Sequence, residues 1–152
     1  VSAEARIAEL GLTLPDAPRP MASYVTAARS GDLVFTAGHG PSRADGTVIT
    51  GKVGAELDVE QGKEAARVTA LAILATLKAE LGSLDQITRI VKVLGMVNCP
   101  PDFKHHPEVI NGCSDLLVEI FGDAGKHARS AVGMGSLPFN IAVEIEMVVE
   151  VG

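Results

Sequence analysis

The spacing of hydrophobic residues along the chain predicts two long helices. Between Asp58 and Gly82, apolar residues recur every three or four positions, and Asp58 and Gln61 have the spacing of a capping box. A second segment with the same period ends at Gly122. The predicted buried positions are Val59, Ala66, Ala70, Ile73, Leu74, Leu77 and Leu81 in the first helix, and Val109, Ile110, Cys113, Leu116, Leu117, Ile120 and Phe121 in the second.

Shorter segments with β-type patterns surround these helices. Residues 24–28 and 33–38 flank a turn at 29–32, which is typical of a hairpin, and residues 47–50 follow an Asp-Gly turn as a predicted edge strand. Residues 87–97 are rich in β-branched side chains and are followed by Asn98 and two prolines, which end a strand.

Two closing strands lie within residues 127–138 and 139–151. The order of strands, helix, strand, helix and two strands predicts an α+β fold, with a single mainly antiparallel sheet and two long helices packed on one face.

Alternation in the closing strands predicts which side chains face the helices. In the last strand the apolar odd-numbered positions from Ile141 to Val151 should do so. In the strand before it, Val132 and Met134 are the large apolar residues, so the pattern places them on the helix side and leaves Arg129, with Ala131, Gly133 and Gly135, on the opposite face. Arg129 and Glu144 are therefore predicted to share the outer face.

The middle strand, residues 87–97, has apolar side chains on both faces, which is expected when both faces are covered. The two helices can cover only one face. The sequence therefore predicts that another copy of the chain covers the other, and that the interface contains small residues, one arginine and at least one carboxylate.

Composition narrows the class of protein. The 152 residues are expected to form one domain, with residues 1–20 as an N-terminal helix and Pro-rich appendage. No apolar run approaches the ~20 residues of a membrane span, and a net charge of −6 without basic clusters argues against nucleic acid. Two cysteines without metal-ligand spacing, and the absence of a recognisable signal peptide, indicate a reduced, cytoplasmic setting.

The C-terminal part of the sequence resembles a known family. Residues 128–132 (ARSAV), Leu137-Pro138 and residues 143–146 (VEIE) resemble the C-terminal signature of the Rid family (YjgF type) of enamine and imine deaminases. Residues 36–38, 91–93, Asp102-Phe103 and Asn111 follow in that family's order, so the resemblance extends from about Tyr24 to the end of the chain.

This resemblance implies a chorismate-mutase-like fold, a homotrimer with its helices outside, and pockets between subunits. It implies that Arg129 binds a substrate carboxylate and that Glu144 holds or activates the attacking water. Tyr24 and Asn111 match positions that line the pocket. The implied reaction is hydrolysis of a 2-imino acid, or of its enamine tautomer, to a 2-keto acid and ammonia, without metal or organic cofactor.

The sequence also departs from the family pattern. Ala37 and His39, on either side of Gly38, replace a usual serine and glutamine, and Ala131 replaces a common cysteine. These changes alter the substrate-binding part of the pocket and, with the N-terminal helix, indicate a longer, divergent branch. An alternative function follows from them: a non-catalytic trimer that binds or senses small carboxylate metabolites.

Each candidate residue also has a purely structural interpretation. Arg129 can form an interface salt bridge, Glu144 can be a solvated strand residue, and Tyr24 can belong to the core. Asn111 can join a helix to a loop, and His39 can be an exposed turn residue. His105 and His106 are adjacent and lack metal-ligand spacing, and Cys99 and Cys113 have the character of buried apolar residues.

Overall fold

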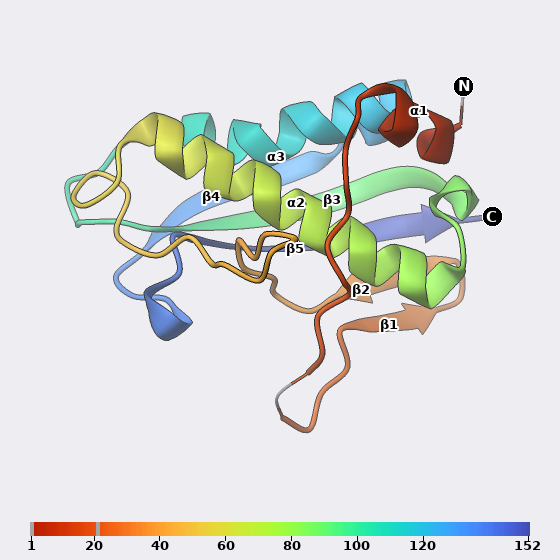
Figure 1. The fold of residues 1–152 in the computed structure, drawn as a ribbon, viewed down its shortest axis with the longest axis horizontal. Helices are drawn as coiled ribbons and strands as arrows, with labels where there is room; N and C mark the ends of the chain where they lie inside the picture. Colours follow the sequence, from red (N-terminus) through yellow and green to blue (C-terminus); the bar gives the residue numbers. More distant parts are fainter. Residues whose placement is uncertain (1, 21) are drawn as a thin grey trace.

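The computed structural model describes residues 2–20 and 22–152 (Figure 1). Its elements are α1 (Ala3–Glu9), β1 (Ala27–Ser30), β2 (Leu33–Thr36), α2 (Val59–Leu81), β3 (Ile87–Asn98), α3 (His106–Phe121), β4 (Ala128–Met134) and β5 (Val143–Val151). Short 3₁₀ turns occupy Leu84–Gln86, Gly122–Gly125 and Pro138–Asn140. Both predicted long helices and the strands of the hairpin, the middle strand and the closing pair are confirmed.

The strands form one mixed sheet in the order β1-β2-β5-β3-β4. β3 and β4 pair in parallel, whereas the other three pairings are antiparallel. Helices α2 and α3 lie on one face of the sheet (Figure 1). The α+β prediction is thus confirmed, with one parallel pairing at the β4 edge.

The predicted edge strand at residues 47–50 is wrong. This segment makes only isolated bridges, between Ser42 and Val48 and between Thr50 and Ile141. The chain turns directly afterwards at Gly51, whose φ of 120° is unfavourable for residues with a side chain. The segment therefore belongs to the loop that leads into α2.

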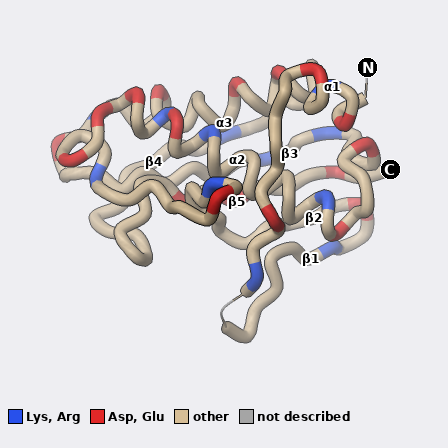
Figure 2. The backbone as a smooth tube through the Cα atoms, in the orientation of Figure 1, with Lys and Arg blue, Asp and Glu red and all other residues tan. Residues whose placement is uncertain are grey.

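Basic and acidic residues are interspersed along the chain (Figure 2). Arg67 of α2 lies 3.8 Å from Glu119 of α3, and Lys78 lies 2.8 Å from Glu4. Within residues 2–20 and 22–152, no helix is long and apolar enough to cross a membrane.

The predicted faces of β5 are confirmed, but those of β4 are reversed. Arg129 is in register with Val93 of β3, which in turn is opposite the buried Met147. Paired residues share a face, so Arg129 lies on the helix side. Val132 is opposite Met96 and lies on the outer face.

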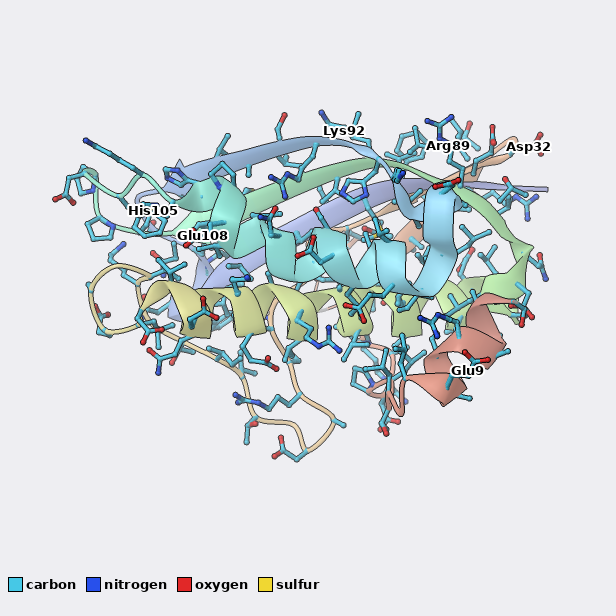
Figure 3. All side chains as sticks on the ribbon, turned by 90° about the horizontal axis from the view of Figure 1, so that it is seen from above. Glu9, Asp32, Arg89, Lys92, His105 and Glu108 are labelled. Atoms are coloured by element: carbon cyan, nitrogen blue, oxygen red, sulfur yellow. The ribbon has the colours of Figure 1, made fainter. Side chains whose placement is uncertain are left out.

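Glu144 is also opposite Met96 and therefore lies on the outer face. Lys92, which points away from the helices in Figure 3, reaches Ser130 on this same face. Arg129 and Glu144 of one chain consequently lie on opposite faces of the sheet, contrary to the sequence-based prediction.

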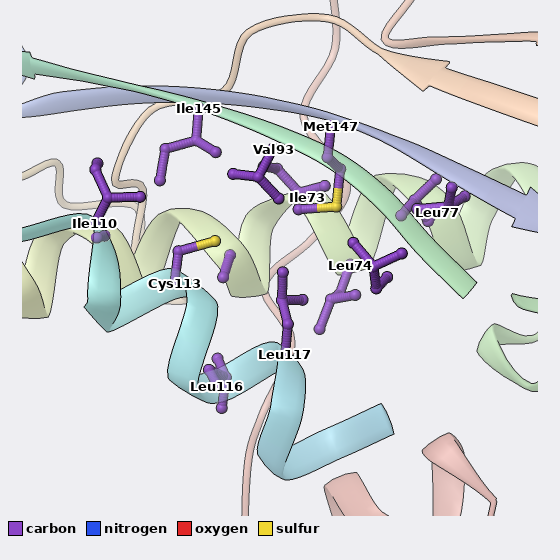
Figure 4. Packing of buried hydrophobic residues seen from close by; sticks show 14 of the residues in the cluster. Ile73, Leu74, Leu77, Val93, Ile110, Cys113, Leu116, Leu117, Ile145 and Met147 are labelled. Carbon is purple, nitrogen blue, oxygen red and sulfur yellow. The ribbon is translucent and has the colours of Figure 1, made fainter. Parts of the chain in front are cut away.

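The main core lies between the sheet and the helices, where side chains of α2, α3, β3 and β5 interlock (Figure 4). The labelled members are Ile73, Leu74, Leu77, Val93, Ile110, Cys113, Leu116, Leu117, Ile145 and Met147. In this core, the buried odd-numbered side chains of β5 pack against the side chains that recur every three to four residues on the helices.

The N-terminal helix is tied to the rest of the fold. Oγ of Ser2 accepts a hydrogen bond from the Ala5 amide and caps α1, and Ile7 is buried. The Glu4 carboxylate accepts from the Leu84 amide and from Nζ of Lys78, both at 2.8 Å. These hydrogen bonds lower the pKa of Glu4, with the Lys78 bond the strongest cause.

A glycine allows α2 and α3 to approach each other closely. A Cβ placed on Gly112 of α3 would overlap the backbone carbonyl of Lys63 in α2. Backbone cannot move aside as a flexible side chain can, so the crossing of the two helices depends on the absence of a side chain at this position.

Replacing Gly112 by alanine is expected to lower the free energy of unfolding by about 2 kcal/mol, since overpacking a tight contact typically costs 1–3 kcal/mol. Urea denaturation followed by circular dichroism measures this change. Gly135→Ala is the control, because a Cβ there meets nothing within 4 Å. Equal stability of the two variants would contradict the proposed helix contact.

Candidate functional site

Arg129 is held on the helix side of the sheet by two neutral oxygens. Its Nη1 donates to Oδ1 of Asn111 at 2.8 Å and to Oγ of Ser114 at 3.1 Å, both on α3. The side chain is half-buried at the β4 edge. Among the described residues, no carboxylate lies within salt-bridge distance of Arg129, and its Nε and Nη2 donate to none of them.

A histidine orients the serine that contacts Arg129. Nδ1 of His127 is 2.7 Å from the Gly125 carbonyl, which can only accept, so Nε2 accepts from Ser114 Oγ at 2.9 Å. Burial lowers the pKa of His127, and the positive charge of Arg129 acts in the same direction. We call Arg129, Asn111, Ser114 and His127 the arginine cluster; Ala131, on the same face two residues further along β4, is half-buried beside it.

Glu144 lies on the other face of the sheet, against the backbone of Gly38. A Cβ on Gly38 would overlap the Glu144 carboxylate in its present position, so the glycine lets this carboxylate lie against the backbone. Burial raises the pKa of Glu144, and the neighbouring charge of Glu146 raises it further. A partly desolvated carboxylate of this kind is suited to accept a proton from water. We call Glu144, Glu146 and Gly38 the glutamate cluster.

His39 is a buried residue, not the exposed turn residue of the structural alternative. It is 5% exposed, its Nδ1 donates to the Ala37 carbonyl at 2.7 Å, and its Nε2 accepts from Thr76 Oγ1 at 2.7 Å. Its backbone pairs with Ile145. Both ring nitrogens thus have protein partners, and burial lowers the pKa of His39.

Tyr24 does not belong to the core, because it is 49% exposed. It lines a pocket together with Gly38 and His39, and residues 15, 16, 18 and 19 of the N-terminal segment form part of the same wall. Of the predicted substrate-binding residues, Tyr24, Gly38 and His39 are therefore brought together, with half-buried Ala37 adjoining them. Asn111 and Ala131 lie with Arg129 instead.

The sequence-based interpretation missed a second group of polar residues. Sγ of Cys99, at the end of β3, is 3.5 Å from Nε2 of His106, at the start of α3. The seven-residue separation gave no helical or strand period to indicate this contact. Cys99 and Cys113 are both buried as expected, and burial raises the pKa of the Cys113 thiol to about 12. Within the described ranges, no three His, Cys, Asp or Glu side chains gather as a metal site.

The buried neutral state of His39 predicts a loss of stability in acid. An unfolded histidine binds a proton below about pH 6.5, whereas the folded state resists it, so stability is present above this pH and falls as the pH decreases from 7 to 5. Burial also lowers the pKa of His127, so this residue contributes to the loss of stability in acid in the same direction.

His39→Gln is expected to flatten this dependence, measured as the melting temperature against pH. The exposed His105, replaced in the same way, is the control and should leave the wild-type slope. An unchanged slope in His39→Gln would contradict the assignment.

Comparison with known proteins gives consistent matches over nearly the whole chain. Residues 4–151 match the model of a family described as "YjgF/chorismate mutase-like, putative endoribonuclease". Protein TCP17 of Trypanosoma cruzi is 42% identical over 147 residues, which cover 96% of this chain and 92% of that protein.

Two solved structures share both fold and sequence with this chain. The protein Atu1372 of Agrobacterium tumefaciens, of unknown function, has a TM-score of 0.91 and 44% identity, over 99% of this chain and 92% of that one. A Shewanella oneidensis protein named as a putative endoribonuclease has a TM-score of 0.95 and 31% identity, over 99% and 100% of the two chains.

Proposed function

Because this chain belongs to the YjgF/chorismate mutase-like family, we propose that it hydrolyses reactive 2-imino acids and their enamine tautomers to 2-keto acids and ammonia. The observation that carries the proposal is the arginine cluster. Asn111 and Ser114 hold Nη1 of Arg129, which leaves the edge formed by Nε and Nη2 for a ligand. That edge matches the two oxygens of a carboxylate, the group common to every substrate of this class.

Glu144 is proposed to position and deprotonate the water that attacks the imine carbon. Its raised pKa makes it a stronger base than an ordinary carboxylate, and Gly38 leaves space for it against the backbone. The attack forms a C–O bond and leaves a tetrahedral carbinolamine, from which ammonia departs after proton transfer to nitrogen. No step requires a redox change.

The two clusters lie on opposite faces of one sheet, so a small substrate does not reach both in the same chain. We therefore propose that the site is completed between protomers of a homotrimer, with Arg129 from one chain and Glu144 from its neighbour. The outer face supports this assembly, because it exposes apolar side chains, among them Phe35 (44% exposed) and Val132 (38% exposed). Light scattering coupled to gel filtration measures the mass of the assembly.

The deaminase proposal is tested by generating 2-aminoacrylate or 2-aminocrotonate enzymatically and following ammonia release with and without this protein. Faster release than the spontaneous rate, in proportion to protein concentration, is the expected result. Spontaneous release at all protein concentrations would remove the proposal.

One observation favours a second candidate, a non-catalytic binder of small carboxylates. The residues around the clusters lack the polar side chains that the family commonly carries: Ala37 and Ala131 stand in their place. This candidate predicts that 2-keto acids raise the melting temperature, that Arg129→Lys abolishes the rise, and that no imine is turned over.

The family is described as a putative endoribonuclease, which would act on RNA. The charges of this chain give little support for RNA binding. The net charge is −6, and Lys and Arg are interspersed with Asp and Glu (Figure 2). RNA-binding surfaces are basic and lined with aromatic residues for base stacking.

A further inference from the structure

A pocket with a different set of functional groups lies between the end of β3, the start of α3 and the end of β4. Its lining includes Lys52, Cys99, Phe103, His106, Gly133 and Met134. A thiol, an imidazole and an ammonium group thus border a space with otherwise largely apolar walls. None of these side chains belongs to the arginine cluster or the glutamate cluster.

The thiol and the imidazole form a hydrogen-bonded pair. Sγ of Cys99 is 3.5 Å from Nε2 of His106, so the thiol donates to this nitrogen when the ring carries its proton on Nδ1. The ring of Phe103 packs edge-on against His106, with centroids 5.2 Å apart and an interplanar angle of 87°. This contact holds the imidazole in place beside the sulfur.

The start of α3 adds a favourable electrostatic environment. The helix begins at His106, after its N-cap His105 (Figure 3). The side chain of His105 makes no hydrogen bond to the first turn. The positive end of the helix dipole therefore lies at this pocket without a capping side chain, where it stabilises negative charge that develops on the sulfur of Cys99 during attack.

Gly133 of β4 provides the space for the pair. A Cβ at this position would lie 2.5 Å from Nε2 of His106 and 2.8 Å from Sγ of Cys99. This close approach accounts for a glycine within the strand, on the helix side and not on the outer face where the sequence pattern had placed it. Gly135, two residues further on, lines the same pocket, and a Cβ there meets nothing within 4 Å.

Lys52 places a fixed positive charge at the pocket. Its Nζ donates to Oδ1 of the fully buried Asn98 at 2.8 Å and to the Gly135 carbonyl at 2.5 Å. An ammonium group has three protons, so one remains for a ligand. Burial raises the pKa of the Cys99 thiol, while a backbone hydrogen bond at Met134 and the charge of Lys52 act against this rise.

We propose that Cys99 and His106 are a nucleophile and its base, which add to small α,β-unsaturated carbonyl compounds in this pocket. His106 takes the thiol proton while sulfur attacks the β-carbon, and the π electrons move to the carbonyl oxygen, where the free N–H of Lys52 stabilises the enolate. The imidazolium then returns the proton to the α-carbon. One S–H bond and one C=C π bond are consumed, one C–S bond and one C–H bond form, and no oxidant is needed.

The narrow access to Cys99, which is 5% exposed, makes the reaction selective for small electrophiles. The test uses the full chain with N-methylmaleimide as probe. Peptide mass spectrometry follows the labelling rates of both cysteines in the same molecules. Cys99 is expected to react faster than glutathione at pH 7, whereas fully buried Cys113 stays unlabelled in the folded protein. Cys99 reacting more slowly than glutathione would overturn the proposal.

The role of the base is tested by His106→Gln. The labelling rate of Cys99 at pH 7 is expected to fall at least about tenfold, and the difference should shrink as the pH is raised, because more of the thiolate then forms without a base. A merely structural role of His106 would give the same ratio at every pH and would contradict the assignment.

Two glycine variants provide a matched pair. Gly133→Ala inserts a methyl group between thiol and imidazole and is expected to slow labelling of Cys99 as His106→Gln does. Gly135→Ala, in the same pocket wall, should label at the wild-type rate. Melting temperatures establish that both variants are folded, and equal labelling rates in two folded variants would contradict the role of the pair.

Discussion

Arg129→Lys is expected to lower kcat/KM for 2-imino acids by between about tenfold and a hundredfold. Lysine keeps the charge but cannot offer two parallel N–H groups to a carboxylate, and it cannot hold the contacts to Asn111 and Ser114 in the same geometry. The loss of one charge-assisted hydrogen bond, worth about 1.5–3 kcal/mol, corresponds to this range. The ammonia-release assay measures it.

The matched control is Arg29→Lys, on an exposed edge strand, where Nε donates only to the Gly31 carbonyl. This variant should retain full activity. If Arg129→Lys keeps wild-type activity as well, Arg129 is not the carboxylate anchor, and its contacts to α3 are structural.

Glu144→Gln is expected to lower kcat by about 10²–10⁴-fold, the usual contribution of a general base, with little change in the Kd of a bound 2-keto acid. The amide fits the space against Gly38 but cannot take a proton from water. The rate of the wild-type protein should rise with pH through the raised pKa of Glu144, and the variant should lack this rise. Wild-type kcat in the variant would exclude Glu144 as the base.

Mixing the two impaired variants tests which chain supplies each residue. If Arg129 and Glu144 of neighbouring protomers form one site, a trimer reassembled from equal amounts of Arg129→Lys and Glu144→Gln chains contains some intact sites. Random assembly restores about a quarter of them, because each site then needs one particular chain on each side. Activity that stays at the level of the separate variants would show that both residues act from the same chain.

The elements of the fold could be predicted because local patterns determine them. The capping box at Asp58 and the glycine at position 82 mark the ends of α2, and both are present in the structure. The strict alternation in β5 identified its buried face. These signals depend on neighbours within a few residues.

The face of β4 could not be predicted in the same way. Val132 and Met134 were assigned to the core because they are the larger apolar side chains, but register with β3 determines the faces. Gly133 faces inward by this register, and His106 and Cys99 fill the space that a side chain there would take. A pairing partner some 35 residues away thus decided the orientation of Arg129, and no local pattern contains that information.

Only part of the candidate site could be predicted, because its remaining contacts also depend on residues far apart in the sequence. Resemblance to a family identified Arg129, Glu144 and Gly38 by their positions in motifs, and the structure places Asn111 beside Arg129 and Gly38 beside Glu144. It did not indicate that His39 is buried against Thr76. The contact between Cys99 and His106 arises from the path of the Pro100-Pro101 loop, which sequence spacing does not describe.

The opposite orientation of the two clusters has a consequence for a lone chain. In the proposed assembly, an isolated protomer carries every group needed for the chemistry and yet has no complete site. Specific activity would then depend on the protein concentration. Dilution that dissociates the trimer would abolish activity without any inhibitor and without unfolding the chain.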